Sequence, residues 1–164
     1  MNTHTPLHLA KFYQGWDGYQ QHLVKALAPL SAEQLSSQIA PHLRSAYTIA
    51  AHIIGARARW SYYVLKIGGD AMFEIGAWDR SGQPVRSAAE LVQGLERTWD
   101  VLQQALAEWT PEDLDEMLED VDDDGTVERM SRQWVIWHLI EHDIHHGGEL
   151  SFVLGANKIP AIDL

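Results

Sequence analysis

Apolar residues recur every three or four positions in four stretches of the chain, which is the pattern of helices that turn one face to a core. The stretches cover residues 6–29, 46–67, 87–108 and 131–154. The expected inward positions are Leu9, Phe12, Trp16, Tyr19, Leu23, Leu27 and Leu30; Ile49, Ile53, Ala56, Trp60, Val64 and Ile67; Leu91, Leu95, Trp99, Leu102 and Leu106; and Val135, Leu139, Leu150 and Val153. Four such helices predict an all-α fold, a four-helix bundle with short extra helical turns.

Capping patterns and polar stretches divide these helices. Ser31-Ala-Glu-Gln34 and Ser87-Ala-Ala-Glu90 are capping boxes, in which the Ser and the residue three positions later satisfy each other's backbone amides. They predict a short turn or helix at 31–36 and the start of the third long helix. Residues 70–86 are rich in Gly, Asp and Pro, and we expect a loop that covers one end of the bundle or forms a lid.

The acidic segment 115–130 resembles part of a calcium-binding loop. Asp120, Asp122, Asp124 and Gly125 match positions 1, 3, 5 and 6 of an EF-hand loop. Position 12 holds Ser131 in place of the bidentate Glu. We therefore expect a solvated acidic turn without useful calcium affinity.

Size and charge narrow the class of protein. A chain of 164 residues with 46% hydrophobic residues suits a single domain, expected over residues 1–164. The net charge of −11 gives no counterion-release affinity for nucleic acid, so a nucleic-acid partner is disfavoured.

The residue types exclude several sites and locations. Without cysteine the chain has no disulfide, iron–sulfur cluster or thiolate zinc site. No run of 18 apolar residues predicts a membrane span, and the first residues lack the features of a signal peptide. We therefore expect a cytoplasmic protein.

The fourth stretch carries the chemistry of greatest interest. His138, His142 and His146 are spaced by four, so they form a row on one helix face. A row of imidazoles beside an apolar stripe favours a metal site, because burial without a partner is costly. His138 and His146 stand roughly 12 Å apart along the axis. Since zinc–nitrogen bonds are about 2 Å long, one ion can take His138 with His142 or His142 with His146, but not all three.

Known motifs around this row do not fit well. His138-Leu-Ile-Glu-His142 has the H-x-x-E-H pattern of one zinc-protease class but lacks a distant downstream ligand. His142-Asp-Ile-His-His146 places Asp143 where H-E-x-x-H needs Glu. On the second helix His52 stands alone, with Arg59 two turns further along the same face.

Two segments together resemble the DinB-like (YfiT-like) superfamily. Ser45-Ala-Tyr-Thr-Ile-Ala-Ala-His52, continuing to Trp60, resembles that family's second-helix motif. The run from His138 through His142, His145 and His146 to Glu149 resembles its fourth-helix motif, H-x-x-x-H-E-x-H-H-R-G-Q. The order of long helices and short turns agrees over essentially the whole chain.

The resemblance implies a divalent metal, nickel or zinc, held by His52, His142 and His146. It makes His138 and His145 neighbours of the site rather than ligands. Gly147 and Glu149 depart from the usual Arg and Gln, which bears on the pocket or on a subunit contact.

The same resemblance implies an activity and an assembly. Family members include transferases and isomerases that use low-molecular-weight thiols, so the expected partner is a small-molecule substrate. The leading hypothesis is a metal-dependent enzyme, a thiol-dependent transferase or isomerase or a hydrolase, with Arg59 and Tyr63 as candidate pocket residues. The alternative is a non-catalytic metal-binding or stress-associated dimer.

A homodimer is expected in both cases. Family members commonly pair through helices. In this chain Trp134 and Trp137 lie on different faces of the fourth helix, so they cannot share one narrow inner stripe. Gly147-Gly148 costs roughly 1 kcal/mol per Gly in mid-helix, which suggests that another backbone approaches there.

Overall fold

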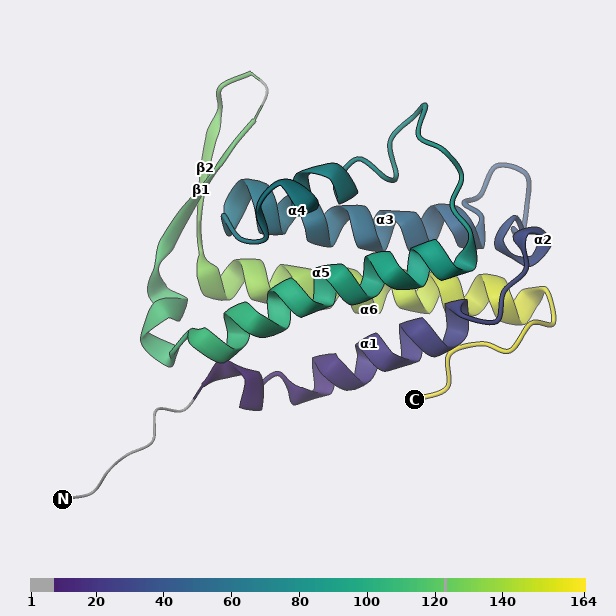
Figure 1. Ribbon diagram of the computed structural model, residues 1–164, viewed down its shortest axis with the longest axis horizontal. Helices are drawn as coiled ribbons and strands as arrows, with labels where there is room; N and C mark the ends of the chain where they lie inside the picture. Colours follow the sequence, from purple (N-terminus) through teal and green to yellow (C-terminus); the bar gives the residue numbers. More distant parts are fainter. Residues whose placement is uncertain (1–7, 123) are drawn as a thin grey trace.

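The computed structural model describes residues 8–122 and 124–164, and it is mostly helical with one small two-stranded sheet (Figure 1). The four predicted long helices are present as α1 (Gln14–Leu27), α3 (Ala46–Arg59), α5 (Ala88–Glu108) and α6 (Arg132–Ala156). They run alongside one another, and α6 packs against α3 (Figure 1). The expected all-α class is therefore only approximate, because a β-hairpin is added.

The first helix begins later than its apolar pattern suggested. Leu9–Lys11 forms a 3₁₀ turn and α1 starts at Gln14, while residues 6 and 7 lie outside the described part of the chain. Phe12 falls in the break between the two and is 63% exposed, so its predicted inward position was wrong. Because the chain is not one continuous helix here, positions spaced by three or four residues no longer lie on the same face. Trp16, Leu23 and Leu27, within α1 itself, are buried as predicted.

The second long helix ends in a wider turn. After Arg59, residues Trp60–Val64 form a π-helical turn, in which the amide of Leu65 donates to the carbonyl of Trp60 (2.9 Å). The chain then reverses at Gly68, whose φ of +79° is a left-handed conformation that suits glycine. π-Turns often accompany functional sites, and this one borders the cleft described below.

The segment predicted as a loop over 70–86 contains a helix. α4 (Gly69–Ile75) lies against α3 and buries Met72 and Ile75, which are three positions apart. The flanking glycines and Asp70 are typical of a loop, so this short amphipathic helix was not predicted. Only residues 76–86 are irregular and lead to α5.

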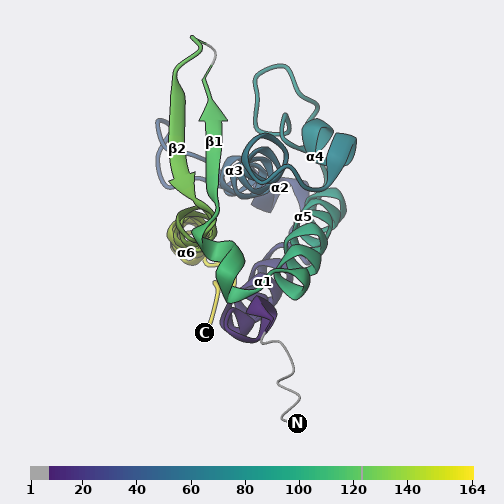
Figure 2. The ribbon, with the colours of Figure 1, turned by 90° about the vertical axis from the view of Figure 1, so that its left-hand side faces the viewer.

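The acidic segment is a hairpin and not a solvated turn. β1 (Met117–Val121) pairs antiparallel with β2 (Val127–Ser131), and Leu118 faces Met130 across the pair. The hairpin follows a 3₁₀ turn, Pro111–Asp115, and projects away from the helices (Figure 2). The inward pair Leu118 and Met130 joins the core, which explains the strand pairing. Asp120 thus lies in a strand, whereas an EF-hand would place it in a loop between two helices.

Both capping boxes are confirmed. Ser31 caps the short helix α2 (Ala32–Leu35), with reciprocal hydrogen bonds between Ser31 and Gln34. Ser87 and Glu90 cap α5 in the same way. Each box satisfies amides that a helix N-terminus would otherwise leave without partners.

The interior contains a polar network among its apolar clusters. Arg57 of α3 and Asp143 of α6 are 0% exposed, with Nη2 and Oδ2 2.8 Å apart. Trp16 Nε1 of α1 donates to the same carboxylate (2.6 Å), and Arg57 also donates to Gln20 (2.6 Å). The network therefore joins three of the four long helices.

Gly147 is explained within the chain. A Cβ at this position would stand 2.1 Å from the Oη of Tyr19 on α1, whereas one on Gly148 would meet nothing within 4 Å. The expected close neighbour of Gly147 is thus a tyrosine side chain, not another backbone. No helix in the described ranges is long and apolar enough to cross a membrane.

Candidate metal centre

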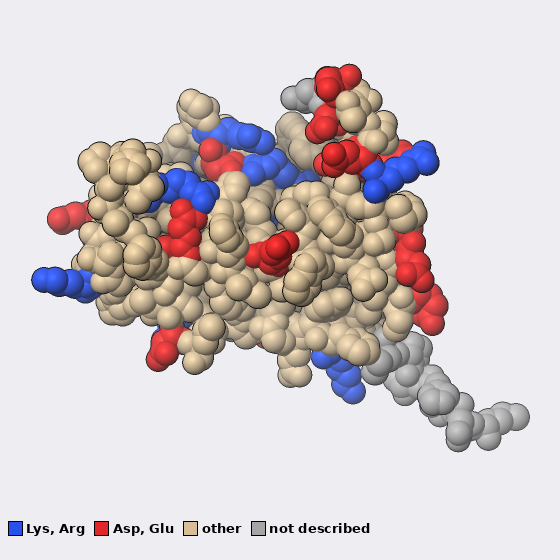
Figure 3. Space-filling view, turned by 180° about the vertical axis from the view of Figure 1, so that it is seen from behind, with Lys and Arg blue, Asp and Glu red and all other residues tan. Residues whose placement is uncertain are grey.

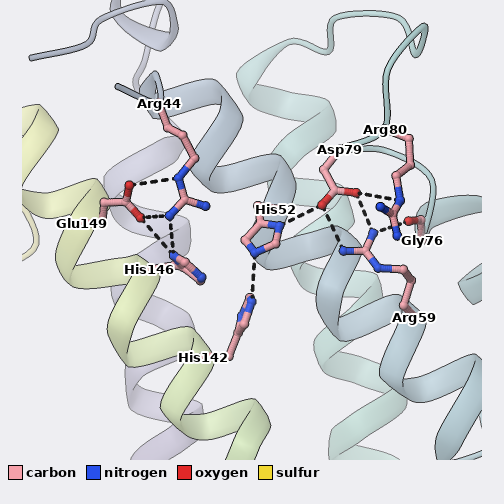
Figure 4. A network of polar contacts seen from close by, with 9 residues as sticks. All are labelled: Arg44, His52, Arg59, Gly76, Asp79, Arg80, His142, His146 and Glu149. Carbon is pink, nitrogen blue, oxygen red and sulfur yellow. Dashed lines mark hydrogen bonds and ion pairs between the residues drawn. The ribbon is translucent and has the colours of Figure 1, made fainter. Parts of the chain in front are cut away.

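Three histidines converge between α3 and α6. His52 comes from the middle of α3, while His142 and His146 lie one turn apart on α6 (Figure 4). Each offers a ring nitrogen within 4.8 Å of those of the other two. The Nε2 atoms of His52 and His142 are 3.2 Å apart. The packing of two helices thus assembles the group from positions that are 90 residues apart in the sequence.

The donor set fits a divalent ion such as zinc or nickel. With metal–nitrogen bonds of about 2.0–2.1 Å, two ligands of one ion lie roughly 3–3.5 Å apart, which matches the 3.2 Å separation. Metal ligation needs neutral imidazoles. Burial lowers the pKa of His142 to about 3, and the positive potential of His146, His52, His138 and Arg57 acts in the same direction. His142 is therefore neutral at physiological pH.

A carboxylate orients the first histidine. His52 Nδ1 lies 2.8 Å from Asp79, which in turn accepts two hydrogen bonds from Arg59 (2.6 and 3.0 Å). Arg59 Nη1 also donates to the carbonyl of Gly76 (2.6 Å), which fixes the irregular segment that carries Asp79. Burial raises the pKa of Asp79, but the hydrogen bonds from His52 and Arg59 outweigh it and hold that pKa far below its ordinary value. Because the ionised carboxylate of Asp79 contacts the Nδ1 of His52, the Nε2 of the same ring remains available to a metal ion.

A second carboxylate orients His146. The Nδ1 of His146 lies 3.0 Å from Glu149 Oε2 and 3.2 Å from Arg44 Nη2, and Arg44 also pairs with Glu149. Burial raises the pKa of Glu149, yet the contacts with His146 and Arg44 bring it below its ordinary value. Burial lowers the pKa of His146, which outweighs the Glu149 hydrogen bond. Histidine ligands are commonly held in this way by a carboxylate on the second ring nitrogen.

His142 has no such partner. Its Nδ1 is buried and forms no hydrogen bond with the described residues. The ring instead packs between the other two histidines, with centroids 4.9 Å from His52 and 4.4 Å from His146. Its orientation depends on packing rather than on a polar anchor.

The remaining sequence candidates lie around this group. His138 is stacked on Trp134 (centroids 5.1 Å, interplanar angle 4°) and is 6.1 Å from the ring of His142. His145 is exposed and touches the ring of His146 at 4.7 Å. Tyr63 lies against Phe73, with ring centroids 6.5 Å apart, and lines the cleft described next.

A cleft of about 890 Å³ lies beyond Arg59. The three histidines and Asp79 do not line it, whereas Arg59 does. Its lining residues are Arg59, Trp60, Tyr63, Val64, Phe73, Glu74, Gly76, Ala77, Trp78, Arg80, Gln83, Arg86, Asp120, Val121 and Asp122.

Fold and site define a helical protein with a three-histidine cluster, and the sequence assigns it to a family. The profile of the DinB family matches residues 1–155, and the chain belongs to that family. No curated protein matches it significantly.

Solved structures share the fold. A DinB-like protein from Bacillus cereus is 24% identical with a TM-score of 0.73, over 98% of this chain and 99% of its own. A DinB-like protein from Bacillus subtilis is 15% identical with a TM-score of 0.66, over 94% and 96%. At these identities the likeness concerns the fold alone.

Two side chains at the centre had no signal in the sequence. Asp79 lies in an irregular segment without periodicity, and Arg44 precedes the cap of α3. The presence of His52 on a helix next to a Gly- and Asp-rich segment was the only hint of a carboxylate partner. Glu149 was visible only as a departure from the family's usual Gln.

Proposed function

We propose that the protein binds one divalent metal ion, nickel or zinc, at His52, His142 and His146 and acts as a metal-dependent enzyme. The observation that carries this proposal is the pair of carboxylate–histidine contacts. Asp79 and Glu149 each take the Nδ1 of one histidine, so that the opposite nitrogens are left for one shared centre. Carboxylate contacts to two of the three histidines indicate a metal site more specifically than the proximity of the histidines alone.

Each side chain then has a task. The carboxylates of Asp79 and Glu149 position His52 and His146, and Arg59 and Arg44 in turn hold the two carboxylates. Three neutral imidazoles would leave the ion its charge and open positions, so that it can polarise a carbonyl or lower the pKa of a bound thiol or water. Arg59 lines the cleft and pairs with Asp79, which contacts His52, so these two side chains connect the cleft with the centre.

The reaction class follows the family resemblance. A transfer or isomerisation that uses a low-molecular-weight thiol, or a hydrolysis, suits a small-molecule substrate and an open metal position. We place this site in one cytoplasmic four-helix-bundle domain over residues 1–164 that works as a homodimer.

Metal analysis of untagged protein tests the site. About one nickel or zinc ion per chain should copurify or bind on reconstitution, and His52→Ala and His146→Ala should each abolish it. His138→Ala is the matched control, since it removes a histidine of the same row, and it should keep the metal. Stoichiometric metal in the His52→Ala protein would contradict the assignment.

Assays of the reconstituted protein test catalysis. A panel of small thiols with electrophilic acceptors should show metal-dependent turnover that His142→Ala abolishes. Full metal occupancy without turnover in any thiol or hydrolysis assay would favour a non-catalytic metal-binding protein.

A further inference from the structure

The cleft beyond Arg59 has two walls of opposite charge. The lining residues come on one side from the C-terminal end of α3 with the turn after it, α4 and residues 76–86, and on the other side from residues 120–122 at the end of β1. Figure 2 shows that α4 and the β-hairpin stand on opposite sides of α3. The first wall contributes three arginines, Arg59, Arg80 and Arg86, against one acid, Glu74, and the second contributes Asp120 and Asp122. Figure 3 shows basic side chains on the surface beside the hairpin and acidic ones gathered on the hairpin itself.

Two of the three arginines have guanidinium groups left for a ligand. Arg59 is occupied by Asp79 and the carbonyl of Gly76. Arg80 is 65% exposed and approaches Asp79 only at 4.0 Å. Arg86 stacks over Trp78, with its Cζ 4.1 Å from the ring centroid, and its Nη1 donates to the carbonyl of Pro84 (3.0 Å), but it forms no ion pair among the described residues. The stacking holds that guanidinium in place while its edge stays available for an anion.

The hairpin supplies unpaired negative charge. Side chains alternate along a strand, so Asp120 lies on the same face as Leu118, which packs on the core. Asp120 is paired in register with Glu128, and like charges directly opposite each other are unfavourable. Neither carboxylate has a cationic partner within the described residues. On the outer face, by contrast, Glu119 is paired with Arg129 (2.8 Å).

Four aromatic side chains also line the cleft and are called the aromatic floor here. Tyr63 and Phe73 are about half exposed although they are large and apolar, and Trp60 and Trp78 are partly buried beside them. Exposed aromatic groups in a concave site are typical of ligand pockets. An anionic ligand alone would face the acidic hairpin, and a cationic ligand alone would face the arginines.

We infer that this cleft binds a zwitterionic ligand of the amino-acid or short-peptide class, with its carboxylate on Arg80 and Arg86, its ammonium on Asp120 and Asp122 and an apolar body on the aromatic floor. Neither the histidines nor a metal takes part in this binding. The site therefore stands independently of the metal centre, although it borders it through Arg59.

Calorimetric titration with three related probes tests this inference. The probes are glycyl-L-phenylalanine, its N-acetyl derivative and its C-terminal amide, used with the metal-free protein. The zwitterion should bind, and removal of either charge should weaken binding roughly tenfold or more, since a charge-assisted hydrogen bond is lost. Equal binding of the N-acetyl derivative would indicate an anion site only and overturn the assignment, as would the absence of binding by all three.

Matched variants identify the two walls. Arg80→Gln should abolish the preference for the zwitterion over the amide, and Asp120→Asn the preference over the N-acetyl derivative. Glu119→Gln, on the outer face of the same strand, and Arg97→Gln, on the exposed face of α5, should change neither preference. Preferences that survive both cleft variants would refute the proposed orientation.

Discussion

Arg57 and Arg59 stand two residues apart on α3, and each pairs with an aspartate, yet the two pairs have different surroundings. Arg57 and Asp143 are 0% exposed, and their hydrogen bonds reach α1 and α6. Arg59 lies at the edge of the cleft and pairs with Asp79, whose carboxylate also contacts the Nδ1 of His52. The comparison teaches that the inner pair fixes how the helices meet, whereas the outer pair fixes a ring nitrogen. Loss of the inner pair should therefore lower the stability of the fold, whereas loss of the outer pair should alter the metal site.

The largest effect is expected for Asp143→Ala. It removes the carboxylate that neutralises the buried guanidinium of Arg57, which keeps only its bond to Gln20, and it leaves the indole NH of Trp16 without its acceptor. Removing one partner of a buried pair typically costs about 3–5 kcal/mol. Urea denaturation should show a loss of that size. The double variant Arg57→Met, Asp143→Leu should regain much of it, and a loss below about 1 kcal/mol for Asp143→Ala would contradict the structural role.

The outer pair should have the converse effect. Asp79→Ala removes the carboxylate that orients His52, and loss of such a partner typically weakens metal affinity 10–100-fold, about 1.4–2.7 kcal/mol. Competition with a chelator measures this change. The urea midpoint of the metal-free protein should move much less than that of Asp143→Ala. Unchanged metal affinity would show that Asp79 serves only to anchor residues 76–86.

Glu149→Gln provides a graded comparison with Asp79→Ala. Glutamine keeps an acceptor for His146 but loses the charge that pairs with Arg44. The loss of metal affinity should therefore be smaller than for Asp79→Ala. A larger loss would mean that the charge, and not the hydrogen bond, dominates at this histidine.

The pH dependence of stability in the metal-free protein further distinguishes the contribution of the site from that of the rest of the fold. The pKa of His142 falls from 6.5 to about 3 on folding, so below pH 6.5 the unfolded chain binds a proton that the folded chain does not. Stability from this group is complete above pH 6.5 and is lost progressively as the pH falls toward 3. Urea titrations across this range should show a shallower slope for His142→Asn. An equal slope in the variant would contradict the shift.

Sequence patterns anticipated the parts of the molecule that rest on periodicity or on local capping. The four long helices and the caps at Ser31 and Ser87 follow from apolar spacing and from contacts three residues apart. The hairpin was missed because its residues are acidic and mostly exposed, and only the inward pair Leu118 and Met130 marks it.

The site was predictable only where a motif exists. The spacing on α6 left two pairs open, His138 with His142 and His142 with His146. The family resemblance selected the second pair and added His52. The carboxylates that hold two of these rings come from a loop and from a position where the family differs. Long-range pairs such as His52 with Asp79 or Arg57 with Asp143 depend on tertiary packing, which no local pattern encodes.

Substitutions on the outer face of α6 are expected to have the smallest effect on the Arg57–Asp143 and Arg59–Asp79 pairs. Trp137, Ile144 and Phe152 are 61%, 53% and 69% exposed at helical spacing, and they form an apolar stripe that a second copy would cover. Light scattering should give about twice the chain mass of 18.5 kDa, and Ile144→Glu should lower it. Metal affinity should not change in that variant. A mass near 18.5 kDa that persists on tenfold concentration would refute the homodimer.

The contact between Gly147 and Tyr19 links two positions that must vary together. Because the phenol occupies the space where a Cβ would stand, a side chain at 147 is compatible only with a smaller or displaced residue at 19. Relatives with the usual Arg at this place in the motif should therefore lack a tyrosine opposite it. A library that randomises both positions should recover paired solutions, with glycine at 147 retained whenever tyrosine remains at 19.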